Sequence, residues 1–434
     1  MYYNDLKNSL NLFNVGIAKG DTHMQLQSTS RFWIYVITGM LSTMVAIAFA
    51  RMSYGVILPY MSDSLSLSYK QSGFLGTITS LGYLCLVLVA GIVASKWGGK
   101  KTILSGISIT TISFLGLALT QNYAMTMVFM LLLGVGTAFT FTTLISTITA
   151  WFPSKRGFVI GLMTSGVGIG VLTTGFLVPY FDEVFSGIGW RYAWASFSLF
   201  GLITLTMIAI FIQNPPEPTA EESHNSTSHR TSPLKIYKNR NLILVGLIYG
   251  IVGLTYLAQS IFIMSYMLEY GIEAKVAGQL VALNGIISIF SSPIWGYISD
   301  RVGRANAIII TCSLTCLAMS VTLISQTLLG FTLHMILLSS TVSGLFTLVQ
   351  ASSMDHVDEP REMPIAFSYV TFYFATGQLI GPLVSGWLIE DFGGFKSAFF
   401  MLTVILAIGI VLAVVLRLNS KKKMHQKISV EETL

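Results

Sequence analysis

The stretch GYISDRVGR at residues 296–304 ends a long apolar run, and it has a counterpart in the first half of the chain, GIVASKWGGKK at residues 91–101. Both stretches combine basic side chains with two glycines at the same spacing. A recurring shift indicates that the chain is built from two similar halves, an organisation typical of membrane transporters. The shift is 205 positions, and it aligns Gly73 with Gly278, Leu75 with Leu280, Gly91 with Gly296, Gly98 with Gly303 and Arg156 with Arg361.

Composition places the protein in a membrane. Hydrophobic residues make up 53% of the 434 positions and charged residues only 10%. A soluble protein carries about 25% charged residues, and a helix needs about 20 consecutive apolar residues to cross a bilayer. We predict twelve membrane-spanning helices, at residues 33–58, 72–94, 102–120, 124–150, 158–181, 190–213, 241–268, 276–299, 306–325, 329–352, 364–389 and 395–417.

Lysine and arginine are distributed unevenly over the loops between these spans. With the N-terminus placed in the cytoplasm, twenty of the 25 lie in cytoplasmic segments. The opposite loops hold Lys70, Arg191, Lys275 and Lys396, and Arg51 lies inside the first span. Such a bias sets orientation, so we expect a multi-pass protein of the cell membrane with both termini in the cytoplasm. The scattered basic residues form no patch that would bind nucleic acid.

The spans and the polar segments divide the chain into five parts. Residues 1–32 form an N-terminal cytoplasmic tail, 33–213 the first six-helix half, 214–240 a cytoplasmic linker, 241–417 the second six-helix half, and 418–434 a basic cytoplasmic tail. The linker is rich in Pro, Ser, Thr and His, a composition typical of flexible connections.

The stretch at 296–304 resembles the loop signature G-x-x-x-D-R-x-G-R of the major facilitator superfamily. Its counterpart at 91–101 keeps the glycines but has Ser95 where the family usually has aspartate. The resemblance extends over residues 33–417. It implies an all-α integral membrane fold, the major facilitator fold, with twelve transmembrane helices in two six-helix repeats and a central site between the repeats.

The paired loops are predicted to form a cytoplasmic gate. Small residues allow close helix contact in bilayers, so we expect such contact at Gly91 and Gly296. Gly98 and Gly303 permit the tight turns. Asp300 is expected to face the positive N-terminal end of the fifth span, in the opposite half.

The gate is expected to be asymmetric, because Ser95 offers only a neutral contact to the start of the eleventh span near Pro364. The alternative is that the basic residues of these loops serve only to set the topology. The predicted gating residues are Gly91, Lys96, Gly98, Arg156, Gly296, Asp300, Arg301, Gly303, Arg304 and Arg361.

Arg51 lies within the first apolar span, in AIAFARMSYGVILP at residues 46–59. A charge in hydrocarbon costs at least about 2.5–3.5 kcal/mol, so such a residue normally faces water, a substrate or a partner. None of the predicted spans contains Asp or Glu, and a guanidinium is suited to bidentate carboxylate binding. We therefore expect Arg51 to recognise an anionic cargo. The alternative is a structural role, with bonds to helix-end carbonyls or to an outer carboxylate.

The pattern R-x-x-Y-G-x-x-x-P at residues 51–59, together with WFPSKRG at 151–157, resembles the bacterial monocarboxylate and oxalate–formate transporter-like branch of the superfamily. In that branch, basic residues of other helices, including the eighth and eleventh, commonly engage the carboxylate. This chain has Asn284 and Gln378 in those two helices and no cation, which leaves the specific substrate open.

Further candidates for the cavity lining are polar and aromatic residues within the spans. Each has an alternative role as an interhelical hydrogen-bond partner. His334 is the one histidine within the predicted spans, but it lies near the outer end of its span, which disfavours a role as proton carrier. The predicted substrate-binding residues are Arg51, Tyr54, Tyr256, Gln259, Asn284 and Tyr373.

These features together predict a secondary active or facilitative transporter that moves a small organic solute by alternating access. An organic anion of the monocarboxylate kind is the favoured cargo. We expect a monomer in the lipid bilayer that binds a small-molecule substrate, and the sequence leaves proton coupling open. We expect no cofactor, metal site or enzymatic activity, since the sequence contains no P-loop and no acid/base cluster.

Three alternatives are an exporter of drugs or metabolites driven by proton antiport, a transport-fold sensor and a membrane enzyme. Met130 stands where many proton-coupled members of the superfamily have arginine, and Val171 where exporters often have proline. Both departures count against a standard drug/proton antiporter.

Overall fold

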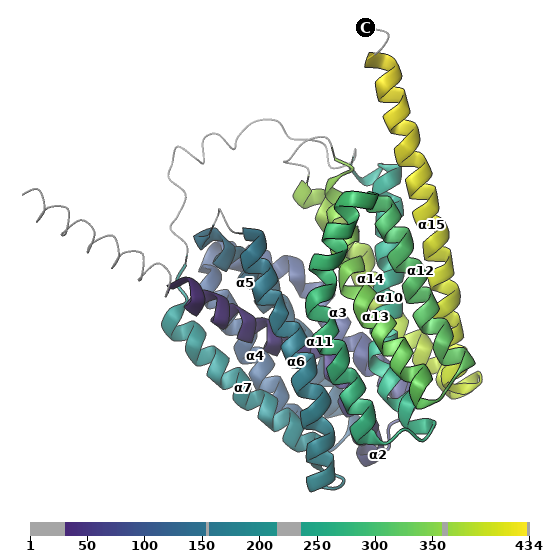
Figure 1. Cartoon of the computed structure of the whole chain (residues 1–434). Helices are drawn as coiled ribbons and strands as arrows, with labels where there is room; N and C mark the ends of the chain where they lie inside the picture. Colours follow the sequence, from purple (N-terminus) through teal and green to yellow (C-terminus); the bar gives the residue numbers. More distant parts are fainter. Residues whose placement is uncertain (1–30, 153–155, 215–235, 358–362, 432–434) are drawn as a thin grey trace, which may run out of the picture.

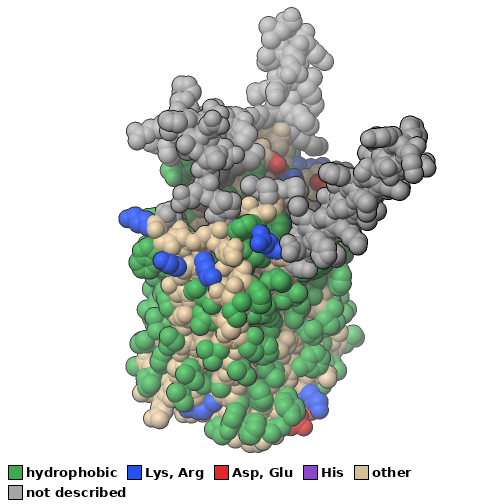
Figure 2. All heavy atoms as spheres, turned by 90° about the vertical axis from the view of Figure 1, so that its left-hand side faces the viewer, with side chains coloured by type: hydrophobic (Ala, Val, Ile, Leu, Met, Phe, Trp, Pro, Cys, Tyr) green, Lys and Arg blue, Asp and Glu red, His purple; other side chains and the backbone are tan. Residues whose placement is uncertain are grey.

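The computed structural model describes residues 31–152, 156–214, 236–357 and 363–431, and its regular structure in these ranges is helical. Eleven described segments, from Arg31–Met52 to Gly394–Ser420, are long and apolar enough to cross a membrane. Helix α3, of 29 residues, is a further long helix beside these eleven segments. Figure 2 shows apolar side chains over the flank of the molecule, with Lys and Arg near its two edges.

The helices form two groups in chain order. The first half contains η1 (Met44–Met52), α2 (Tyr54–Leu65), α3 (Tyr69–Trp97), α4 (Gly99–Leu119), α5 (Tyr123–Trp151), α6 (Arg156–Val184) and α7 (Gly189–Phe211). The second half contains α10 (Arg240–Glu269), α11 (Ala274–Val302), α12 (Arg304–Ile324), α13 (Leu328–Met354), α14 (Met363–Asp391) and α15 (Gly394–Glu431). All long helices run between the same two ends of the molecule (Figure 1).

The first span, predicted at 33–58, contains a π-helical segment. Residues 31–43 are α-helical, η1 is a π-helix, and Ser53, which has helical dihedral angles, connects it to α2. The amide of Ser53 donates to the carbonyl of Ala48 over 2.8 Å, five residues back, which is the π-helical pattern. A π segment turns the side chains that follow it to a new face. The span predicted at 33–58 is therefore helical and has a π-helical segment at the position of Arg51.

Local sequence explains where several helices begin. Ser68 and Gln71 form a reciprocal capping box at the start of α3. Gly98 and Gly303 have φ angles of +84° and +86°, a left-handed conformation that only glycine adopts at little cost. Two equivalent turns therefore connect α3 to α4 and α11 to α12, as the repeat predicts.

The two halves meet along α3 with α14, α6 with α11, and α2 with α10. A Cβ atom added to Gly73 would lie 2.3 Å from the carbonyl oxygen of Pro382, and one added to Gly278 would lie 2.3 Å from that of Gly175. Glycine is therefore needed at both contacts, because any side chain would push the halves apart.

We call the end that carries Gly98 and Gly303 the linker end, and there the described residues leave open space around Gly91 and Gly296. A Cβ at Gly91 or Gly296 would meet no described atom within 4 Å. The close helix contact predicted at these two glycines is thus absent in this conformation. The physical reason is that the halves contact each other at the opposite end, so their helices diverge toward the linker end.

Candidate functional site

Arg51 lies in the last turn of η1 and is buried, with 8% of its surface exposed. Its guanidinium donates from Nη2 to Oε1 of Gln378 over 2.8 Å, and more weakly to Oγ of Ser80 over 3.4 Å. Its Cζ lies 4.9 Å from the ring centroid of Tyr83, a cation–π contact. The partners that the described residues provide for the guanidinium are thus all uncharged.

The bond between Arg51 and Gln378 joins the two halves of the protein. Arg51 belongs to the first half, and Gln378 lies on α14 in the second. Ser80 and Tyr83 come from α3, which packs against α14. The amide oxygen of Gln378 is a neutral acceptor, so this bond does not neutralise the charge of the guanidinium. A buried cation of this kind favours an anionic ligand when one is available.

Two further predicted binding residues lie beside Arg51. Tyr54 lines the same small cavity of about 10 Å³, and its hydroxyl donates to the carbonyl of Ser72 over 2.8 Å. The hydroxyl of Tyr256 approaches Sδ of Met52 at 3.1 Å, next to Arg51 in the chain. The cavity beside Arg51 holds at most a single water molecule, so a solute would have to displace side chains here.

The other three predicted binding residues make hydrogen bonds that lead away from Arg51. Gln259 contacts Nε2 of His334 at 3.2 Å. Asn284 accepts from Ser288 on its own helix over 3.1 Å. Tyr373 pairs with a neighbouring tyrosine hydroxyl on α14. The structure thus groups Arg51, Tyr54 and Tyr256 and does not bring the remaining three into direct contact with this group.

Gln378, Ser80 and Tyr83 contact Arg51 but were not among the predicted binding residues. Gln378 lies in the motif G-x-x-x-G-P at residues 377–382, and it is the polar residue that the eleventh span offers in place of a cation. The replacement of a cation by Gln378 in this span was the feature of the sequence that could have identified it as a partner of Arg51. The signal from Ser80 and Tyr83 is weaker, because small polar and aromatic residues occur throughout the spans.

His334 is fully buried between three helices. Its Nδ1 lies 2.7 Å from the carbonyl oxygen of Ala318, and its Nε2 lies 3.2 Å from the amide of Gln259. This arrangement links α13 to α12 and α10. Both ring nitrogens thus have hydrogen-bond partners within the protein, which favours a structural role for His334.

The predicted gating residues on α3, α11 and α12 lie at or near the linker end. Lys96 and Asp300 are exposed, and Asp300 forms no ion pair with any described residue. Arg301 lies over the ring of Tyr297 with its Cζ 4.4 Å from the centroid, and Arg304 pairs with Asp355 at 2.7 Å. The contact expected between Asp300 and the start of the fifth span stays a prediction, because residues 153–155 and the side chain of Arg156 lie outside the described part of the chain.

Some predicted gating residues fall outside the part that can be described. Arg361 lies between the described ranges, and the side chain of Arg156 is likewise outside the described set, as are those of Ser95 and Pro364. Their predicted roles stay predictions.

The opposite end of the bundle carries ion pairs between the halves. Lys70 at the start of α3 pairs with Asp391 at 2.8 Å and with Glu390 at 3.7 Å, both at the end of α14. Lys275 at the start of α11 pairs with Glu183 near the end of α6, at 3.8 Å. The repeat shift of 205 positions superposes the two lysines.

Comparison with known proteins agrees with this geometry. The family model of the Major Facilitator Superfamily matches residues 40–360 and 251–433. The chain belongs to the major facilitator superfamily. This protein is therefore a multi-pass membrane transporter of small solutes and not an enzyme.

Individual relatives are distant. The hexuronate transporter of Bacillus subtilis is 22% identical over 382 residues, which cover 81% of this chain and 86% of that protein. The agnestins efflux protein AgnL12 of Paecilomyces divaricatus is 24% identical over 413 residues, covering 93% and 91%. Among solved structures, a D-xylose–proton symporter superposes with a TM-score of 0.72 at 14% identity, over 88% of this chain and 97% of that one. This likeness establishes the fold.

Proposed function

We propose that the transporter carries a small organic anion with a carboxylate group, and that Arg51 binds this carboxylate. The observation that supports the proposal most directly is the buried guanidinium between the halves, whose partners among the described residues are neutral. We further propose that the protein resides in the cell membrane with both termini in the cytoplasm, as the distribution of lysine and arginine favours.

A carboxylate would form stronger bonds to Arg51 than its present partners do. A carboxylate adds the attraction between opposite charges, which the neutral amide of Gln378 lacks, and the guanidinium can bind both carboxylate oxygens at once. The bond to Ser80 is long at 3.4 Å, so little is lost when it is replaced. An incoming carboxylate would therefore displace Gln378 and Ser80 and weaken the link between the halves at this point. Cargo binding and conformational change would thereby be coupled.

Two likenesses support an anionic cargo. The pattern at residues 51–59 resembles the monocarboxylate and oxalate–formate branch, and the relative from Bacillus subtilis is a hexuronate transporter. We propose a cargo of this monocarboxylate-like class. The predicted spans contain no Asp or Glu, so facilitated diffusion or anion exchange accounts for transport without a carboxylate proton carrier.

Ligand-induced thermal stabilisation of the purified protein tests the proposal. The test compounds are lactate, oxalate and glucuronate, with neutral glucose as the control. We expect at least one of the carboxylates to raise Tm and glucose to have no effect. In Arg51→Ala the affinity for that carboxylate should fall about 10-fold or more, because a hydrogen-bonded charge pair is lost. Arg51→Lys should give an intermediate value, since it retains the charge but not the planar fork.

Lys238→Ala is the matched control, because Lys238 is an exposed cation outside the membrane-spanning helices. It should bind the carboxylate as the native protein does. Equal carboxylate binding by the native protein and by Arg51→Ala would remove Arg51 from the binding role.

The second candidate function is efflux of a drug or metabolite driven by proton antiport. It is favoured by the likeness to AgnL12, which covers 93% of this chain. Proteoliposomes distinguish the two functions. Counterflow of a labelled carboxylate without a pH gradient supports the anion carrier, whereas flux of a cationic or neutral compound that requires a pH gradient supports the exporter.

A further inference from the structure

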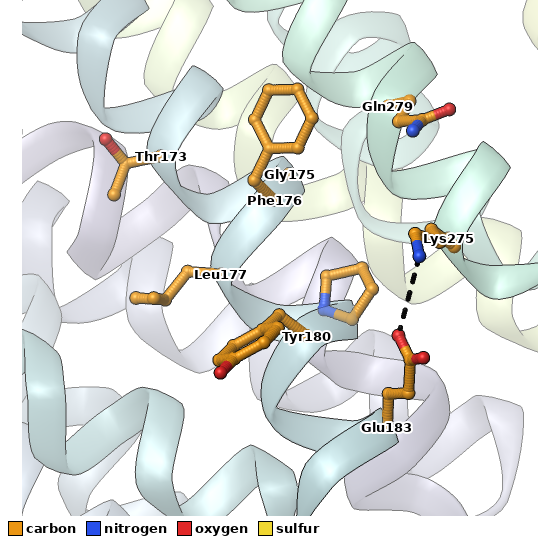
Figure 3. A pocket seen from close by; sticks show the side chains of 9 residues that line it. Thr173, Gly175, Phe176, Leu177, Tyr180, Glu183, Lys275 and Gln279 are labelled. Carbon is orange, nitrogen blue, oxygen red and sulfur yellow. Dashed lines mark ion pairs between the residues drawn. The ribbon is translucent and has the colours of Figure 1, made fainter.

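The contact between α6 and α11, the α6/α11 seam, contains a cavity of about 390 Å³ that is separate from the Arg51 site. Its wall is mainly apolar and includes Phe176, Leu177, Pro179 and Tyr180 of α6 (Figure 3). Phe176 and Tyr180 are 54% and 59% exposed, and both lie on a helix long and apolar enough to cross the membrane. The cavity therefore opens toward the hydrocarbon of the bilayer.

One end of this cavity carries a pair of opposite charges. Glu183 and Lys275 lie at the ends of α6 and α11 that point away from the linker end, with Oε2 and Nζ 3.8 Å apart (Figure 3). That separation is too long for a hydrogen bond. Their side chains are 65% and 62% exposed. Each charged group thus keeps its capacity to bind another partner at the depth where lipid headgroups lie.

The repeat-related seam provides an internal comparison. There Lys70 donates to Asp391 over 2.9 Å, and the backbone amide of Lys70 donates to Glu390 over 2.9 Å. Among the described residues, the ion pair of the equivalent lysine of the α6/α11 seam is the long contact to Glu183. The charges of the α6/α11 seam are therefore the ones left available for a ligand.

We propose that the α6/α11 cavity binds a phospholipid whose headgroup contains a phosphate and a primary ammonium group. An acyl chain would occupy the apolar cavity, the phosphate would bind Lys275, and the ammonium would bind Glu183. One positive and one negative charge match a zwitterion. A primary ammonium donates hydrogen bonds to a carboxylate, which a quaternary choline group cannot do, and an anionic headgroup would be repelled by Glu183.

Such a lipid would connect the two halves, because α6 belongs to the first and α11 to the second. A ligand that binds one conformation stabilises it by mass action. The lipid would therefore favour the conformation in which this seam is closed. This proposal does not depend on the identity of the cargo.

Native mass spectrometry of the full-length protein tests the proposal. The probes are phosphatidylethanolamine, phosphatidylcholine and phosphatidylglycerol with identical acyl chains, added singly at equal concentration. We expect phosphatidylethanolamine to be retained most strongly. Glu183→Gln and Lys275→Ala should each lower its retention about threefold, the effect of losing one exposed ion contact. Lys70→Ala, the matched control on the other seam, should retain it as the native protein does.

A charge reversal sharpens the experiment. Glu183→Lys creates a site with two positive charges, which should prefer phosphatidylglycerol, while the double variant Glu183→Lys with Lys275→Glu should recover the preference for phosphatidylethanolamine. Size-exclusion profiles establish that each variant is folded. Equal retention of the three lipids by the native protein, or a preference that Glu183→Gln, Lys275→Ala and Glu183→Lys all leave unchanged, would overturn the proposal.

Discussion

The two seams between the halves, α3/α14 and α6/α11, share a backbone arrangement but differ in their side chains. In both, glycines bring backbones into direct contact, at Gly73 with Pro382 and at Gly175 with Gly278. The α3/α14 seam is also closed by the ion pair of Lys70 at 2.8 Å. The corresponding pair of the α6/α11 seam is loose at 3.8 Å. The two seams thus share the close approach of their helices, whereas the ion pairs at the ends of the seams differ.

The divergence has a source in the sequence. Lys70 and Lys275 are 205 positions apart, whereas their partners Glu183 and Asp391 are 208 apart. An offset of three residues is close to one turn of helix, so the repeat preserves the cation but not the position of the acid. The Arg51 site also lies at the α3/α14 seam, since Gln378 comes from α14 and Ser80 from α3. The tighter seam is the one that contains the candidate cargo site.

The largest effect is expected from filling a glycine contact of the α3/α14 seam. A Cβ at Gly73 would lie 2.3 Å from the backbone oxygen of Pro382, which cannot move as a flexible side chain can. Gly73→Val should destabilise the protein by about 1–3 kcal/mol, the range for overpacking, and should reduce transport strongly. Thermal unfolding in detergent and uptake into proteoliposomes measure the two effects.

Gly91→Val is the matched control for stability, because Gly91 has open space around it. Its Tm should equal that of the native protein. Its transport rate tests the gating role, since a gate that closes at Gly91 would be blocked by the added side chain. A Gly73→Val protein with native Tm and native transport would show that close approach at this seam is not required.

An intermediate effect is expected at the Arg51 end of the same seam. Gln378→Glu replaces the neutral acceptor of Arg51 with a carboxylate in nearly the same place. The variant should bind an added carboxylate about 10-fold or more weakly, because an internal anion now competes for the guanidinium. Gln378→Leu, which removes the acceptor, should instead retain carboxylate binding. Isothermal titration distinguishes them, and equal affinities for both variants would separate Gln378 from the cargo site.

Much of the fold follows from the sequence because hydrophobic length alone specifies a membrane-spanning helix. The apolar runs placed the spans, and the repeat placed the turns at Gly98 and Gly303, whose φ angles are positive. The π-helical segment of the first span was not predictable. Hydropathy measures burial but carries no information on whether amides bond four or five residues back.

The candidate site was predictable only in part. The cost of burying a charge pointed to Arg51, and its burial among neutral groups agrees with that reasoning. The bond to Gln378 spans 327 positions, and nothing local in the sequence specifies such a pairing. The contact expected at Gly91 and Gly296 depends on which end of the bundle is closed, and a sequence does not specify one conformation of a protein that alternates between several.

The smallest effect is expected from the ion pairs, and it tests the difference between the seams directly. Lys70→Ala should lower Tm measurably, because Lys70 holds Asp391 and Glu390 together at the end of α14. Lys275→Ala should leave Tm nearly unchanged in detergent without added lipid, because its contact to Glu183 is long and exposed. The Lys70→Ala effect should shrink at 1 M salt, where exposed charges are screened. Equal Tm shifts for the two alanine variants would show that the seams do not differ in strength at this end.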